Sequence, residues 1–251
     1  MLAELSAGSV ATSTSDPSLL RRVRKFLPMC QLAASRGSAI LAQFAVQLVV
    51  GTMVGASGLG VLQLFTSWTC IAGEILALGL PTRAMRLVSV AYAEQQGDVI
   101  RQLLRDARRK IIRLWFLLAL LAGAPLALLL HTQTPPDWAH YGSLLVGAAL
   151  AAPFFSLLRL YAESLKATGG ALAAVTLESL TSPIALLLVC AVCWLTGQVV
   201  LTTTLLIAFG LSLVVTPLAL HSRLRQQLAL LPAEGALQGK AKTLSPTVRG
   251  E

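Results

Sequence analysis

The sequence predicts an all-α polytopic membrane protein in which six transmembrane helices form one bundle. The first observation behind this prediction is composition. Of 251 residues, 55% are hydrophobic and 12% are charged, with a mean hydropathy of +0.73, whereas soluble domains carry about 25% charged residues. The second is a series of six apolar segments of roughly 20 residues, the length that a helix needs to cross the hydrocarbon. The third is that Lys and Arg avoid three of the connections between them.

The first 36 residues precede the predicted bundle. Residues 1–16 are rich in Ser, Ala and Thr, so we expect a disordered N-terminal tail. They do not resemble a signal peptide, because no basic segment is followed by an apolar core. Pro17 is typical of a first helical turn. Residues 17–36 then predict a basic juxtamembrane helix, broken at Pro28, that lies against membrane lipids with anionic headgroups.

Residues 37–220 are expected to form the six-span lobe. The first two spans make a membrane hairpin without Lys or Arg, and a polar connection at 82–113 leads to the other four. The six spans are predicted at 38–55, 59–80, 111–130, 141–158, 171–195 and 199–220. Residues 221–251 contain no further apolar run of this length, so we expect a cytoplasmic C-terminal tail.

The distribution of basic residues predicts the orientation. All 20 Lys and Arg lie in the N-terminal region, around the connection after span two, between spans four and five, or in the C-terminal tail. The connections around Ala56, Thr134 and Gln198 have none. Because Lys and Arg are retained on the cytoplasmic side, both termini are expected there. A net charge of +9 would suit a nucleic acid only if the cations shared one face. Their distribution instead follows membrane topology, so no nucleic-acid partner is expected.

Four polar residues inside the spans are candidate functional groups. Glu74 and Glu178 fall within spans two and five, and an ionised side chain at the centre of a membrane helix costs about 2.5–3.5 kcal/mol. Each acid should therefore face the bundle interior or a cavity. Either they bind protons, cations or a polar substrate, or they are protonated and hydrogen bonded across helices. Gln43 and Gln47, four residues apart in span one, either line the same cavity or hold helices together.

Three arginines are candidates to meet an anionic headgroup. Arg83 and Arg86 follow span two, and Arg159 ends span four. Guanidinium groups match the geometry of phosphate oxygens. The alternative is that these are stop-transfer charges that extend to the interface. Arg159 and Glu163 are four residues apart and could instead pair with each other.

Neither an enzyme nor a metal site is expected. Cys190 and Cys193 imitate a CxxC motif, but they stand in an apolar segment without other ligands. His131 and His140 flank one connection with no third ligand nearby. No Walker loop, GxSxG or HExxH motif occurs. We therefore expect no cofactor, no metal and no catalytic residues.

Three stretches resemble motifs of a transporter superfamily. They are Gly55-x-x-Gly58-Leu59-Gly60 at the turn into span two, ALGLPT at 77–82 followed by Arg86, and ESLKATG at 163–169. In their order and placement they resemble the multidrug/oligosaccharidyl-lipid/polysaccharide exporter superfamily, and more narrowly its polysaccharide and O-antigen flippase branch. The resemblance covers about residues 36–220.

The resemblance implies a flippase of the bacterial inner membrane that moves polyprenyl-linked oligosaccharide by alternating access between two lobes. It implies that Arg83 and Arg159 bind the pyrophosphate of the carrier, and Arg86, Gln43 and Gln47 are the other candidate substrate-binding residues. It also implies that Glu74 or Glu178 couples transport to protons or sodium. Flippases of this kind have two lobes with the site between them, and this chain resembles the N-terminal lobe only. It would then need a second six-helix half or a second copy of itself, or be a truncated remnant.

Two alternatives stay open. One is a drug or cation exporter of the same superfamily, although span one lacks the acid usual in cation-coupled members. The other is a non-transporting membrane scaffold that docks enzymes of glycan assembly through its basic cytoplasmic face.

Overall fold

The computed structural model describes residues 17–131 and 136–231, and these parts of the chain form six helices without strands. Side chains are described for 29–120 and 142–231. The predicted all-α class is confirmed. The helices are α1 (Pro17–Ala77), α2 (Leu80–Ala93), α3 (Gly97–His131), α4 (Pro136–Ala167), α5 (Ala171–Thr196) and α6 (Thr202–Ala229).

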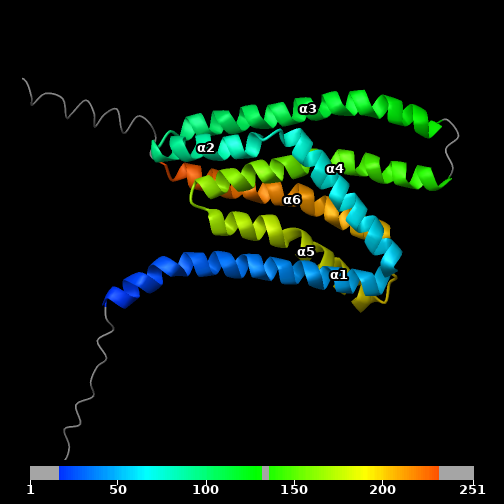
Figure 1. Cartoon of the computed structure of the whole chain (residues 1–251), viewed down its shortest axis with the longest axis horizontal. Helices are drawn as coiled ribbons and strands as arrows, with labels where there is room; N and C mark the ends of the chain where they lie inside the picture. Colours follow the sequence, from blue (N-terminus) through cyan, green and yellow to red (C-terminus); the bar gives the residue numbers. More distant parts are fainter. Residues whose placement is uncertain (1–16, 132–135, 232–251) are drawn as a thin grey trace, which may run out of the picture.

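Helix α1 makes a double pass because it bends sharply at Gly55. The backbone there has φ 79° and ψ 175°, and every other residue of α1 keeps helical angles. These angles lie in a region that is essentially open only to glycine. Figure 1 shows the first limb running along the bundle and the second limb turning back from the bend. The two limbs correspond to the predicted hairpin, with a one-residue bend where a short loop was expected.

The start of α1 is partly as predicted. The helix begins at Pro17, the position expected from the preference of proline for the first helical turn. The predicted break at Pro28 is wrong, because the helical angles continue through it. A proline within a long helix can be accommodated when the neighbouring turns absorb the lost hydrogen bond. The expected tail at 1–16 lies outside the described residues.

Helix α2 was not anticipated, since the sequence predicted only a polar connection there. Gly79 adopts φ 71° and ends the preceding segment, and Pro81 then occupies the first turn of α2. The helix buries Ala84, Val88 and Ala91, spaced four and three residues apart. That spacing, together with Pro81, is the signal that the sequence offered.

Helix α4 lies at the centre of the bundle and packs against α1, α2, α3, α5 and α6. It crosses the second limb of α1 closely at Gly73, whose carbonyl oxygen accepts a hydrogen bond of 2.7 Å from the hydroxyl of Ser156. A Cβ atom at Gly73 would come within 2.5 Å of the Phe155 ring. The small residue therefore allows this helix contact.

Four described segments are long and apolar enough to cross a membrane: Met29–Ala77, Gly142–Ala167, Ala171–Thr196 and Thr202–Ala229. The first contains the Gly55 bend and so includes both limbs of the hairpin. Large apolar side chains such as Ile40, Leu188 and Leu211 remain exposed on the outside of these helices. The third predicted span falls in α3, whose side chains after Leu120 lie outside the described part of the chain. Most of the connection around Thr134 also lies outside it, as do residues 232–251. The count of six spans stays a prediction.

Among the described residues, one end of the bundle has no Lys or Arg. Figure 1 shows the Gly55 bend and the α5–α6 connection at one end, and the α2–α3 and α4–α5 turns with the end of α6 at the other. Helix α5 and the second limb of α1 contain no Lys or Arg. Four other segments, the first limb of α1 and helices α3, α4 and α6, do contain Lys or Arg. In each of them the cation nearest to the end with the Gly55 bend lies about 18 to 23 residues from that end, roughly 27–35 Å at 1.5 Å per residue. We call this region the cation-free slab, and its depth matches the hydrocarbon core of about 30 Å. The nearest cations that define it are Arg36, Arg113, Arg159 and Arg223.

Replacing Gly55 by Ala should destabilise the fold by about 1–3 kcal/mol, because a side chain there must adopt a strained backbone conformation. Gly60→Ala is the matched control. It also has open space around it, and inside a helix Ala stabilises by about 0.5–1 kcal/mol relative to Gly. Thermal unfolding in detergent should give a lower midpoint for the first variant and an equal or higher midpoint for the second. A Gly55→Ala variant as stable as the parent would contradict this account of the bend.

Candidate functional site: a charge cluster beneath a polar cavity

Three helices bring charged side chains together at the edge of the cation-free slab that lies opposite the Gly55 bend. Arg159 of α4 contacts Glu74 of α1 through Nη2 at 3.0 Å and Nε at 3.1 Å, and its Nη1 lies 3.0 Å from Oε1 of Glu178 on α5. Lys166 of α4 lies 2.9 Å from the other oxygen of Glu178 and 2.8 Å from Glu163. We call these five residues the charge cluster. Glu178 thus joins both cations.

Local sequence explains this convergence. Arg159, Glu163 and Lys166 are four and three residues apart, so they share one face of α4. Gly169, with φ 88°, then reverses the chain into α5, a conformation that glycine adopts without steric cost. The turn sends α5 back along α4 and brings Glu178 opposite the Arg159–Lys166 face. Glu74 comes from the second limb of α1, which crosses α4 at Gly73.

The cluster is unevenly exposed. The side chain of Glu178 is 18% exposed, whereas those of Arg159 and Glu74 are 39% and 52% exposed. Its three carboxylates exceed its two cations by one formal negative charge. Glu178 is therefore the least exposed acid of the cluster and the one that contacts both cations, and we call it the anchor of the cluster. Glu74 is the acid most accessible to solvent or to a ligand.

A cavity of about 440 Å³ opens above Glu74, Arg159 and Glu178. Its polar walls come from α1, α5 and α6, and they reach into the cation-free slab. The polar and hydroxyl side chains on these walls are Gln43, Gln63, Thr66, Ser179, Ser182, Ser212 and Thr216. Several of these hydroxyls donate to carbonyls of their own helix, including Ser212 to Phe209 and Thr216 to Ser212. The hydrogens of these hydroxyl groups are therefore satisfied within their own helix, without a hydrogen bond across the cavity.

The structure brings together four of the seven predicted site residues. Glu74, Glu178, Arg159 and Gln43 all line the cavity, whereas Gln47 is exposed and does not. The expected alternative pairing of Arg159 with Glu163 is wrong. Arg159 instead binds the two acids on neighbouring helices, and Glu163 binds Lys166.

The other two predicted residues lie elsewhere. Arg83 and Arg86 are exposed on α2. Arg83 lines a separate hollow of about 160 Å³ together with Asp106 and Lys110 of α3. Neither arginine forms an ion pair within the described residues. Their predicted contact with a headgroup would thus take place away from the charge cluster.

Sequence reasoning missed Lys166 as a site residue and counted it only for topology. The available signal was its spacing from Arg159 and Glu163, followed by a Gly-Gly turn and Glu178. The ion pair between Lys166 and Glu178 can be predicted only if α5 is known to fold back onto α4. Gln63, Ser182 and Thr216 were missed for the same reason, since single polar residues in apolar helices do not reveal which face they occupy.

No metal centre is visible in the described part of the chain, where no group of three His, Cys, Asp or Glu lies close enough to hold an ion. The side chains of His131 and His140 lie outside it. Cys190 is buried and Cys193 is partly buried in α5.

Long apolar helices around a polar cavity that contacts charged side chains indicate a helical membrane protein. Comparisons of the chain with protein-family models, with curated proteins and with solved structures find no match.

Replacing Glu178 by Gln should destabilise the bundle more than replacing Glu74. The first change leaves Arg159 and Lys166 without a shared carboxylate in a mostly buried position, at a cost of about 1–3 kcal/mol. The second breaks a half-exposed pair, worth at most about 1 kcal/mol. The free energy of unfolding, measured by denaturant titration in micelles, should rank the variants in this order. Equal losses would mean that Glu178 is not the anchor.

Proposed function

We propose that this chain is one lobe of a flippase that moves lipid-linked oligosaccharide across the bacterial inner membrane by alternating access. The observation that carries the proposal is the charge cluster at the floor of a polar cavity, between helices apolar enough to cross a membrane. Ionised groups in such surroundings are costly, so they commonly mark the path of a polar substrate or ion. The resemblance of the three sequence stretches supports the same conclusion.

The proposed topology has six spans with both termini in the cytoplasm. Its support is the bend that divides α1 into two limbs, together with the cation-free slab of roughly one hydrocarbon thickness. The cations then lie on the cytoplasmic side. The charge cluster consequently sits at the cytoplasmic edge of the hydrocarbon, where a headgroup first enters.

In the proposed mechanism, Arg159 exchanges partners. Its guanidinium has two edges, one on Glu74 and one on Glu178, and either edge fits a phosphate oxygen. A proton taken up by Glu74 removes its negative charge and releases Nε and Nη2 to the pyrophosphate of the polyprenyl carrier. Glu178 keeps its contact with Arg159, and Lys166 contacts its other oxygen. Release of the substrate and of the proton then restores the resting pair.

The cavity walls suit the carbohydrate. Amides such as Gln43 and Gln63 and hydroxyls such as Ser182 offer donors and acceptors to sugar hydroxyls. A volume of about 440 Å³ lies within the range of ordinary ligand sites, about 300–1,000 Å³. The cavity is open, so a second lobe would complete it. We propose that this lobe is a separate six-helix polypeptide or a second copy of this chain. Arg83 and Arg86 add cationic charge on α2 toward the proposed cytoplasmic side.

One observation favours the alternative of a cation exporter. The charge cluster carries one more carboxylate than cation, so it would also attract a positively charged substrate. Such a substrate would need the acids and not the guanidinium of Arg159. The two functions thus differ in their dependence on Arg159.

Arg159→Gln should abolish most flipping of a fluorescent polyprenyl-pyrophosphate sugar in proteoliposomes, because the proposed phosphate contact is lost. Arg109→Gln, on α3 and outside the cavity lining, is the matched control and should behave as the parent. The protein is reconstituted alone and together with any six-span partner recovered with it. Flipping is measured as the fraction of fluorophore protected from a membrane-impermeant quencher.

Insertion of each variant is verified first by its yield of folded protein. Parent-like flipping by Arg159→Gln would contradict the proposed role. Loss of organic-cation efflux in Glu74→Gln, with Arg159→Gln unaffected, would identify the exporter instead. A parent that moves neither substrate, alone or with its partner, would favour a scaffold.

A further inference from the structure

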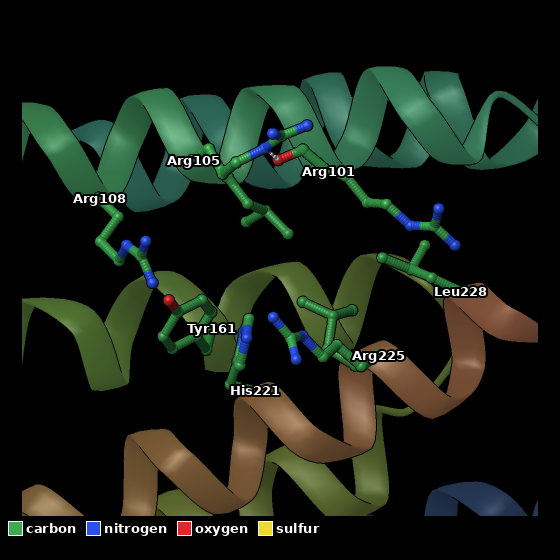
Figure 2. Close-up of a pocket in the computed structure, with 9 residues that line it drawn as sticks. Arg101, Arg105, Arg108, Tyr161, His221, Arg225 and Leu228 are labelled. Carbon is green, nitrogen blue, oxygen red and sulfur yellow. Dashed lines mark hydrogen bonds between the residues drawn. The ribbon is translucent and has the colours of Figure 1, made fainter.

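Another hollow, of about 510 Å³, lies between α3, α4 and α6 at the cationic end of the bundle. Four arginines line it, three from α3 and one from α6. Figure 2 shows the guanidinium groups of Arg101, Arg108 and Arg225 extending beside the hollow, whereas Arg105 turns back along α3 and its Nε donates to the Arg101 carbonyl oxygen at 3.4 Å. We call it the arginine pocket. Its polar lining residues are Arg101, Arg105, Arg108, Tyr161, His221 and Arg225.

The spacing of these residues explains why they meet. The three arginines of α3 are four and three residues apart and therefore occupy one face of that helix. His221 and Arg225 are likewise four apart on α6. Helix α4 lies between them and supplies Tyr161 from below (Figure 2).

The lining of the arginine pocket includes buried side chains. Leu104, Leu224 and Leu228 are buried beneath it, and so is Tyr161. The Tyr161 and His221 rings lie 5.0 Å apart between centroids. Figure 2 shows the guanidinium of Arg108 pointing toward the Tyr161 hydroxyl. The buried Nδ1 atom of His221 has no hydrogen-bond partner among the described atoms.

The charge of the arginine pocket is largely uncompensated. No carboxylate lines it. Arg101 contacts Asp98 at 3.2 Å, but both side chains are more than half exposed, so this pair adds little. Arg105, Arg108 and Arg225 form no ion pair within the part of the chain that the structure describes. Like charges held around one hollow repel one another, and an anion between them would relieve that repulsion.

We propose that the arginine pocket binds a phosphate group. Guanidinium groups form paired, charge-assisted hydrogen bonds to phosphate oxygens, and convergent arginines from separate helices are suited to such a ligand. The phosphate belongs either to the headgroup of an anionic phospholipid or to a free phosphate compound in the cytoplasm. Basic hollows between membrane helices on the cytoplasmic side are a known setting for headgroups. The ligand would also join α3 to α6, which both pack against α4.

This site is separate from the proposed transport cavity, since the two share no lining residue. Its test therefore uses binding and not flipping. Failure of the flippase proposal would leave the result unaffected, and failure here would leave the transport result unaffected.

The experiment compares the full chain with two double variants in lipid nanodiscs. The pocket variant carries Arg108→Gln and Arg225→Gln. The matched control carries Arg109→Gln and Arg223→Gln, which are close in sequence but do not line the arginine pocket. In the first arm, inorganic pyrophosphate is titrated into phosphatidylcholine discs by calorimetry. In the second, native mass spectrometry counts phosphatidylglycerol retained from discs of equal parts phosphatidylcholine and phosphatidylglycerol.

We expect the pocket variant to lose about tenfold or more in affinity or lipid retention, and the control to match the parent. A loss confined to the first arm assigns a free phosphate compound, and a loss confined to the second assigns a headgroup. Absence of binding by the parent in both arms, or equal losses in the two double variants, overturns the proposal. If the pocket variant does not fold, Arg108→Gln and Arg225→Gln are tested singly under the same criteria.

Discussion

The cation-free slab is the constraint on which the rest of the structure depends. In four of the helical segments the nearest Lys or Arg lies about 18 to 23 residues from the same end of the bundle, and the other two apolar segments have none. At 1.5 Å per residue this spacing corresponds to about one hydrocarbon thickness. Apolar side chains can remain exposed around such a slab because lipid, and not water, would face them. Gly55 closes the hairpin at the cation-free end without adding a polar loop.

The same constraint explains where polar chemistry gathers. Ionised residues collect at the opposite edge of the slab, in two different arrangements. In the charge cluster, Arg159 and Lys166 are neutralised by Glu74, Glu163 and Glu178, and the cavity above extends into the apolar region. In the arginine pocket the cations face a hollow without a carboxylate. The first arrangement is the one to which we assign the proposed exchange of partners, and the second is the one to which we assign the proposed phosphate.

Hydropathy and charge were sufficient to predict the all-α class and the hairpin that Gly55 closes, and the preference of proline for a first helical turn predicted the start of α1 at Pro17. They failed at α2, because a short helix with a small apolar face resembles a polar connection. Glu74 and Glu178 were identifiable as site residues because ionised groups inside apolar segments are costly. Arg159 was also predicted as a site residue, but its pairing with these two acids was not, since that contact depends on how α1 and α5 cross α4. The local pairing expected with Glu163 was replaced by contacts across helices.

The most direct test of this account is cysteine accessibility from the two sides of the membrane. In a variant whose four native cysteines are replaced by serine, single cysteines are introduced as Ala56→Cys and Gln198→Cys at the cation-free end, and as Gln96→Cys and Leu230→Cys at the other. A membrane-impermeant maleimide added to intact spheroplasts should label the first two, and the second two only after permeabilisation. Labelling of all four from outside, or of Gln96→Cys before Ala56→Cys, would contradict a slab that spans the membrane.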